Sequence, residues 1–250
     1  MESEGWTRTI GADGVSAKNG DVGAVIAYSL AIDDQLRAAP HFAEGVWDKL
    51  IGDDYTAGTR TSGGDGSGEL AFSEGAATDK ASGSQVYVMV VSERNNGIAF
   101  PIIAVAADQA TLKAKLPTAT SVNELRRLNA FPLRCTGLAG GWTSSDVSAA
   151  ETYDASGSFT GLVVSALRID LSFTADAKYT RKISVYQNTS EVKEDDSGSY
   201  AATDTAITLT SSAGKTTNYG ASYVAVRGGL ALYIQNQQFS GDNFVLYRAK

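Results

Sequence analysis

Histidine and cysteine are almost absent from the sequence, with one residue of each among 250. A single cysteine, Cys135, excludes an intrachain disulfide and therefore a disulfide-stapled scaffold. We interpret Cys135 as a free thiol in a linker, because no histidine or basic cluster lies nearby to lower its pKa. Pairing between chains or a nucleophilic role are the alternatives. A histidine-based zinc site or a Ser-His-Asp triad would need His41, which follows Pro40 at an expected helix start, where exposed histidines are common.

Positive charge and long hydrophobic runs are also scarce. The chain has 21 Lys and Arg against 28 Asp and Glu, a net charge of −7, which argues against a nucleic-acid partner. The nearest basic cluster, Lys178, Arg181 and Lys182, is expected to lie on a solvated strand face. No run of about 18 apolar residues is present, so we expect no transmembrane segment. We also expect that an export signal originally preceded Met1, and hence an extracytoplasmic location, periplasmic or secreted.

The residues that are plentiful favour strands and turns. Glycine is abundant, with 26 residues against 4 prolines, and hydrophobic residues make up 43% of the chain. This composition supplies a core and favours β-structure over helix.

The first half, residues 1–129, is predicted to be an α+β domain with an antiparallel sheet and helices. Apolar residues at Phe42, Val46, Trp47 and Leu50 predict an amphipathic helix over 41–51 that ends at Gly52. Residues 56–68 are rich in Gly, Ser and Thr, and we expect them to form a hairpin or loop. Strands are expected at 14–18, 23–31, 69–73, 85–94 and 97–106, and helices at 109–116 and 121–129.

Two features of this half favour particular local structures. The run from Val86 to Val91 is apolar on both faces, as in a central strand that is covered on both sides. The Asn95-Asn96-Gly97 segment supplies the positive φ angles of a tight hairpin turn.

The element order of this half, together with Gly5-Trp6 near its start and the closing Leu125-Arg126-Arg127-Leu128-Asn129 helix, resembles the PsbP/DcrB-like α/β sandwich group. The resemblance covers about 125 residues. It implies an accessory or binding module without catalytic residues.

The second half is predicted to be all-β. A linker is expected over 130–137, because this segment carries a Pro and a Gly. From Leu138 to Lys250, eight short strands follow one another at hairpin spacing, which predicts an up-and-down barrel. The expected strands are 141–147, 161–173, 178–186, 191–201, 206–211, 216–226, 230–235 and 243–248.

Gly140-Gly141-Trp142 matches the G-x-W signature on the first strand of lipocalins and their calycin relatives. The last strand ends in Arg248, and the segments 171–182 and 196–210 also resemble small bacterial lipocalin-like domains. The resemblance implies that Trp142 closes one end of the barrel and that Arg248 packs over its ring, a contact of about 0.5–2 kcal/mol. Alternatively, Trp142 is a core aromatic residue of another all-β fold.

Tyrosines are frequent in the predicted barrel, and strand alternation should point some of them inward. We predict that a small hydrophobic ligand contacts Tyr179, Tyr200, Tyr219 and Tyr233. The alternative, that side chains fill a barrel of this size, stays open.

Other polar clusters have simpler interpretations. The carboxylates Glu191, Glu194, Asp195 and Asp196 are expected to solvate a hairpin, and the pairs Asp33-Asp34 and Asp53-Asp54 lack the spacing of a calcium loop. We therefore expect no metal and no cofactor. Asn188-Thr189-Ser190 matches an N-glycosylation sequon, a pattern that is frequent by chance.

The sequence therefore predicts a non-enzymatic, exported bacterial binding protein whose ligand lies in or beside the barrel. The alternative is a structural subunit of an extracellular filament or envelope layer that assembles through protein–protein contacts. An enzyme has the least support, because no catalytic motif is present.

Overall fold

The structure is a computed structural model that describes residues 5–39, 41–64, 70–95, 98–135, 137–153, 159–187, 190–237 and 243–249. At 37–38, 95, 135, 145–153, 159–166, 187 and 243 the backbone alone is described. The centre of the predicted Asn95-Asn96-Gly97 turn and the sequon residue Asn188 lie outside the described residues.

The chain divides into two compact units. Unit 1 comprises Met1–Ala130 and Ala225–Gly229, and unit 2 comprises Phe131–Val224 and Leu230–Lys250. The segment predicted to be a linker, 130–137, is instead largely part of unit 2. Phe131 and Leu133 pack in its hydrophobic core, and Leu133–Cys135 form the short 3-10 helix η2. The start of the second unit therefore lies at 131 rather than 138.

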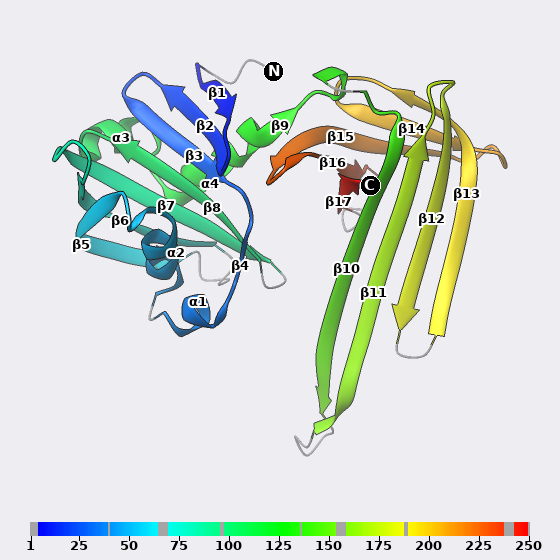
Figure 1. The fold of residues 1–250 in the computed structure, drawn as a ribbon, viewed down its shortest axis with the longest axis horizontal. Helices are drawn as coiled ribbons and strands as arrows, with labels where there is room; N and C mark the ends of the chain where they lie inside the picture. The colour runs from blue at the N-terminus through cyan, green and yellow to red at the C-terminus, as the bar shows by residue number, and fades with distance from the viewer. Residues whose placement is uncertain are drawn as a thin grey trace. The chain divides into compact units, whose positions relative to one another are not determined.

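Unit 1 is built on an eight-stranded antiparallel sheet with the strand order β1-β2-β3-β8-β7-β6-β5, and β4 also pairs with β8 (Figure 1). The strands are β1 (Thr7–Ile10), β2 (Gly14–Asn19), β3 (Val22–Ala27), β4 (Leu30–Ala31), β5 (Tyr55–Gly64), β6 (Leu70–Asp79), β7 (Gln85–Asn95) and β8 (Ile98–Ala106).

Helices pack against both faces of this sheet. The helices are α1 (Asp34–Ala38), α2 (Phe42–Ile51), α3 (Gln109–Lys115), α4 (Ala119–Asn123) and the 3-10 helix η1 (Glu124–Asn129). On one face, Val88 and Val90 pack in a core with Trp47 of α2. On the other face, the α3 residue Lys113 forms an ion pair of 2.6 Å with Glu74. The central strand β7 is therefore covered on both sides, as its apolar run predicted.

Helix α2 follows its predicted pattern. The helix begins at Phe42, one residue after the predicted start, and buries Val46 and Trp47. Residues 56–68 were predicted to form a hairpin or a loop, and the structure agrees with the hairpin: 56–64 are in β5, which pairs antiparallel with β6. Among the described residues, no helix is both long and apolar enough to cross a membrane.

Unit 2 is an eight-stranded closed antiparallel barrel. Each strand from β10 to β17 pairs with the next, and β10 pairs with β17 to close the barrel. The strands are β10 (Gly140–Tyr153), β11 (Phe159–Phe173), β12 (Lys178–Gln187), β13 (Ser190–Ala202), β14 (Ala206–Ser211), β15 (Thr216–Val226), β16 (Gly229–Asn236) and β17 (Asn243–Arg248), and the short β9 (Ala130–Phe131) precedes them.

The barrel confirms the predicted strands. Each of the eight predicted segments overlaps one observed strand, and the bounds of β14, β15 and β17 agree. The largest difference is in β10, predicted to end at Val147 and observed to continue to Tyr153. Its Ser- and Ala-rich end gives a weak strand pattern, but β11 pairs with it over its whole length.

Strand pairing extends further in one part of unit 2 than in the rest. β17 pairs with β10 at Trp142 and Thr143, and β14 pairs with β13 only from Gly198 onward. β10, β11, β12 and β13 continue past these points as a four-stranded sheet, visible in Figure 1 as the long green-to-yellow strands. We call this extension the arm; it comprises 144–153, 159–169, 183–187 and 190–194.

The closed end of the barrel is held by a contact between its first and last strands. Trp142 is 3% exposed, and the guanidinium carbon of Arg248 lies 4.6 Å from its ring centroid. Arg248 also donates a 2.9 Å hydrogen bond to the carbonyl of Ala139. A Cβ atom at Gly140 would come within 3.0 Å of that guanidinium, and φ of Gly140 is +122°, so a glycine is required here.

We expect the substitution Arg248→Met to lower the free energy of unfolding of the barrel by about 1–2 kcal/mol. It removes a cation–π contact and a charged hydrogen bond but keeps an apolar stem of similar length. Urea unfolding followed by Trp fluorescence measures the change. Lys215→Met, at an exposed turn, is the matched control and should change the stability by less than about 0.5 kcal/mol. Equal effects of the two substitutions would show that the contact does not stabilise the closed end.

A candidate ligand-binding face on the barrel arm

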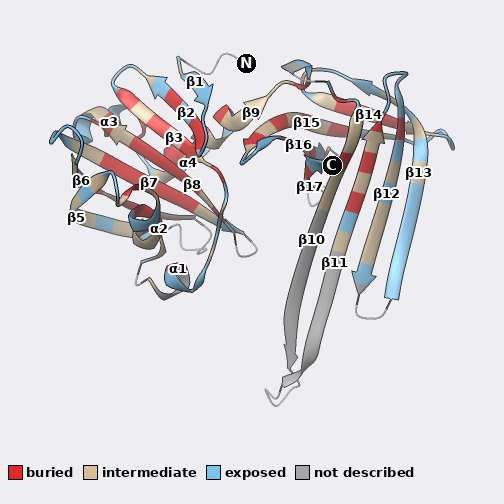
Figure 2. Cartoon of the chain, viewed as in Figure 1, coloured by how far each residue is buried: buried red, intermediate tan, exposed pale blue. Residues whose placement is uncertain are grey.

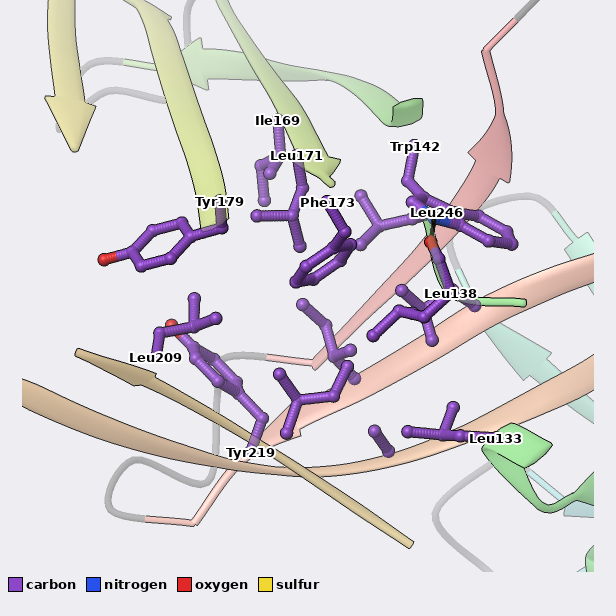
Figure 3. Packing of buried hydrophobic residues seen from close by; sticks show 14 of the residues in the cluster. Leu133, Leu138, Trp142, Ile169, Leu171, Phe173, Tyr179, Leu209, Tyr219 and Leu246 are labelled. Atoms are coloured by element: carbon purple, nitrogen blue, oxygen red, sulfur yellow. Dashed lines mark hydrogen bonds between the residues drawn. The ribbon is translucent and has the colours of Figure 1, made fainter. Parts of the chain in front are cut away.

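Three of the four tyrosines predicted to contact a ligand lie in or against the barrel core. Tyr179 is 2% exposed and Tyr219 is 7% exposed, so both are packed among other side chains (Figure 3). Tyr200 packs its ring edge-on against Phe173, with the centroids 4.8 Å apart. The side chains of these residues fill the space in which a ligand was predicted.

Tyr233 does not face the barrel interior. Its neighbours Leu232 and Ile234 belong to the core, and side chains alternate along a strand, so Tyr233 points outward. Tyr223, not selected from the sequence, is fully buried and stacks on Trp142 with the ring centroids 5.7 Å apart. The sequence predicted strand β16 but placed Tyr233 on its inward face, which Leu232 and Ile234 form instead.

The packed core ends at a layer of polar side chains on the inner face of the barrel. Arg181, whose side chain is 18% exposed, donates hydrogen bonds to the Tyr219 hydroxyl (3.2 Å) and to Glu194 (2.7 Å). Asp196 lies 3.7 Å from the same guanidinium and accepts a 2.6 Å hydrogen bond from the Tyr179 hydroxyl. Through Arg181 these contacts connect β12 with β13 and β15.

Arg181 was expected on a solvated face, and the structure corrects this. It alternates with Tyr179 and Ile183, both of which contact the core, so its side chain points inward. The alternation was visible in the sequence, but a basic residue is more common on the outer face. The Nε atom of Arg181 is buried and has no hydrogen-bond partner among the described residues.

Beyond this polar layer the inner face of the arm becomes apolar again. Strand register places Leu167, Val185 and Val192 in one row across β11, β12 and β13. Ile183 lies in the adjacent row, between Ile169 and Glu194. Val192 is 66% exposed, the largest exposure among the exposed large hydrophobic residues. An apolar surface thus continues from the core onto the arm.

The outer face of the same strands is polar and charged. Asp170, Lys182 and Asp195 face one another in register, and Arg168 forms a salt bridge of 2.8 Å with Asp170. Figure 2 shows the part of β13 that lies in the arm, 190–194, as exposed. The arm is therefore amphipathic, with the apolar side continuous with the barrel interior.

The acidic cluster predicted to solvate a hairpin is divided between the two faces of β13. Glu194 and Asp196 point inward toward Arg181, whereas Glu191 and Asp195 point outward. The carboxylates therefore do not converge on one point. No group of three or more potential metal ligands occurs among the described residues.

The remaining candidate residues lie in unit 1 or have side chains that the structure does not describe. His41 is exposed at the N-cap of α2 and makes no side-chain capping hydrogen bond. Asp33 caps α1 by accepting a hydrogen bond from the Leu36 amide, and it pairs with Lys49. The side chain of Cys135 is not among those described.

A comparison of the chain with protein-family models, curated proteins and solved structures finds no match. The PsbP/DcrB-like and lipocalin-like resemblances therefore stay predictions, and the site is argued from its own geometry.

The Tyr179 hydroxyl gives the polar layer a pH dependence. Burial raises the pKa of Tyr179 above its ordinary value, and the hydrogen bond to Asp196 raises it further. An unfolded chain loses a tyrosine proton near about pH 10, whereas the folded barrel retains this one. Above that pH the unfolded state binds fewer protons, so the free energy of unfolding falls as the pH rises.

We predict that Tyr179→Phe makes this fall less steep between about pH 10 and 11, by at most about 1.4 kcal/mol per pH unit. Urea midpoints measured across this range give the slope independently of any constant loss of stability. Tyr247→Phe, at a residue that is 50% exposed, should leave the slope unchanged. The same slope in wild type and Tyr179→Phe would contradict a Tyr179 that stays protonated in the barrel.

Proposed function

We propose that this protein is a non-enzymatic, exported binding protein whose lipocalin-like barrel holds a small hydrophobic ligand beside its core. The observation that carries the proposal is the apolar inner face of the arm, formed by Leu167, Ile183, Val185 and Val192. It borders the packed core on one side, and the exposed Val192 is available for contact. Covering such side chains gives roughly 25 cal/mol per Å² of apolar surface.

The polar layer next to this face defines the second property of the ligand. Arg181, Glu194 and Asp196 present donors and acceptors where the apolar surface meets the core. The ligand that fits best has an apolar chain or ring and one polar, hydrogen-bonding end.

A small ligand fits this face better than a second protein chain does. Stable protein–protein interfaces bury at least about 1,000 Å² in total. Among the arm residues whose side chains the structure describes, four on this face are apolar, and of these only Val192 is an exposed large hydrophobic residue. The described apolar surface is therefore sufficient for a small molecule and too small for an obligate interface.

The structural-subunit alternative has one observation in its favour. β14 pairs with β13 from Gly198 onward, and the Ser212 amide donates to the Ser197 carbonyl, so the described pairings leave 190–196 as a strand edge. That edge carries Glu191, Lys193, Glu194, Asp195 and Asp196, however, and charged side chains on an edge strand oppose pairing with another chain. The edge therefore favours a barrel that does not polymerise.

We expect the full chain to bind the neutral fluorescent probe N-phenylnaphthylamine, and we expect Val192→Asp to weaken binding by about tenfold or more. A loss of about 1.4 kcal/mol corresponds to tenfold in Kd, and a carboxylate in the apolar contact costs at least that much. Fluorescence titration measures the Kd. Tyr247→Asp, which places the same charge on the opposite face of the barrel, is the matched control.

Equal affinity of the wild type and Val192→Asp would contradict the proposed site. Sedimentation velocity on the same samples separates the alternatives. A sedimentation coefficient independent of protein concentration agrees with the binding function, and one that rises with concentration and falls on Val192→Asp would favour assembly instead.

A further inference from the structure

The sheet of unit 1 carries a groove of about 400 Å³ on the face that helix α2 covers farther along. Its floor is formed by β1, β2, β3 and β8, which are neighbours in the sheet in that order (Figure 1). Helix α2 packs on β5, β6 and β7, and the groove continues the same face toward the β1 edge. Its volume is within the range of about 300–1,000 Å³ that small-molecule sites occupy.

The groove exists because one position on its floor has no side chain. Gly23 of β3 lies in register between Lys18 of β2 and Val105 of β8. A Cβ atom at Gly23 would have its nearest contact at 4.0 Å, with the carbonyl oxygen of Val105, so the space above this residue is open. In the adjacent row the short side chain of Ser16 lies beside Val25. These small side chains give the groove its depth.

One side of the groove is apolar. Val25 and Val105 are half-buried and pack against the core that contains Trp47. Tyr55, at the start of β5, is also half-buried, packs against the same core and lines the groove. A tyrosine ring offers a flat apolar surface together with one polar hydroxyl. A ligand in the groove therefore meets an aromatic ring and two branched aliphatic side chains on this side.

The opposite side of the groove is polar. The exposed side chains of Thr9, Ser16 and Lys18 line it. None of these three side chains, nor the Tyr55 hydroxyl, makes a hydrogen bond or an ion pair with a residue that the structure describes. Thr9 pairs with Ser16 and Ser16 with Val25, so the hydroxyls follow directly on the apolar side. Hydroxyls both donate and accept hydrogen bonds, and an ammonium group donates them.

This combination matches a sugar ring better than it matches a purely apolar ligand. A pyranose has C–H groups on its two faces and hydroxyl groups around its rim. An apolar ligand would cover the hydroxyls of Thr9 and Ser16 without offering them a partner, and a covered polar group without a partner costs free energy. A sugar hydroxyl can donate to these side chains and accept from them.

We propose that this groove binds a neutral pyranose unit of an oligosaccharide. One face of the sugar ring lies against Tyr55, above Gly23. Its hydroxyls exchange hydrogen bonds with Thr9, Ser16 and Lys18. The site is in unit 1 and differs in ligand chemistry from the arm face, so it does not depend on the function proposed above.

NMR titration of the full chain with cellohexaose, maltohexaose and mannohexaose tests the site. We expect at least one of these sugars to shift the amide signals of Ser16, Lys18 and Gly23 in a saturable way. Gly23→Val should weaken this binding at least about tenfold, a loss of about 1.4 kcal/mol, because the new side chain occupies the open space above the floor.

Ser16→Val tests the hydrogen bonds without filling the groove. It should weaken binding about threefold or more, as expected for the loss of one hydrogen bond. Thr61→Val is the matched control and should leave the affinity unchanged. It also removes an exposed hydroxyl from a strand of this sheet, but on the opposite face, because its neighbour Ser62 points toward α2.

The absence of shifts at these amides with all three sugars would overturn the proposal. So would equal affinity of the wild type and a folded Gly23→Val chain. If circular dichroism shows that Gly23→Val does not fold, Ser16→Val and Thr61→Val decide the question, and equal affinities of these two variants would overturn it. Shifts of the same size with sodium sulfate at the same concentration would assign the groove to an anion at Lys18 instead.

Discussion

The structure of unit 2 depends on how far its first and last strands can pair. β17 meets β10 at Trp142 and Thr143, and Arg248 covers Trp142 there. A sheet has a fully enclosed interior only where its edges are joined, so the buried core is concentrated near this closure. Beyond it β10 to β13 still pair with one another but no longer enclose an interior. The closed core, the polar layer at Arg181 and the exposed Val192 all follow from this unequal strand length.

Much of this architecture could be predicted from the sequence, because β-strand alternation and turn residues are local signals. The eight barrel strands, the helix at α2 and the buried strand β7 follow their patterns. The direction in which individual side chains point was harder to predict. Tyr233 faces outward and Arg181 inward, because the face of each strand is set by its neighbours in the closed barrel. A cavity of about 470 Å³ in unit 1 was not predicted, because small lining residues such as Gly64 and Ala71 leave the space unfilled and form no recognisable motif.

The two units combine apolar surface and charge in different ways. In unit 2 the charges of Arg181, Glu194 and Asp196 are largely satisfied within the protein, so they orient a ligand more than they attract one. In unit 1 the cavity of about 470 Å³ has mostly small and apolar lining residues, and the guanidinium of Arg94 packs over the Phe42 ring there. The proposed site on the arm therefore suits a neutral ligand. This agrees with the general rule that binding sites gain affinity from apolar walls and selectivity from a few polar groups.

The central claim is that the inner face of the arm is where unit 2 binds its ligand. Hydrogen–deuterium exchange with mass spectrometry, with and without saturating N-phenylnaphthylamine, tests it most directly. The account predicts slower exchange in peptides covering 183–187 and 190–194, where a ligand would cover the strands and restrain their opening. The exchange rates of peptides from 206–211 and 230–236, in the closed part of the barrel, should not change. Protection confined to the closed part, or to unit 1, would contradict the claim.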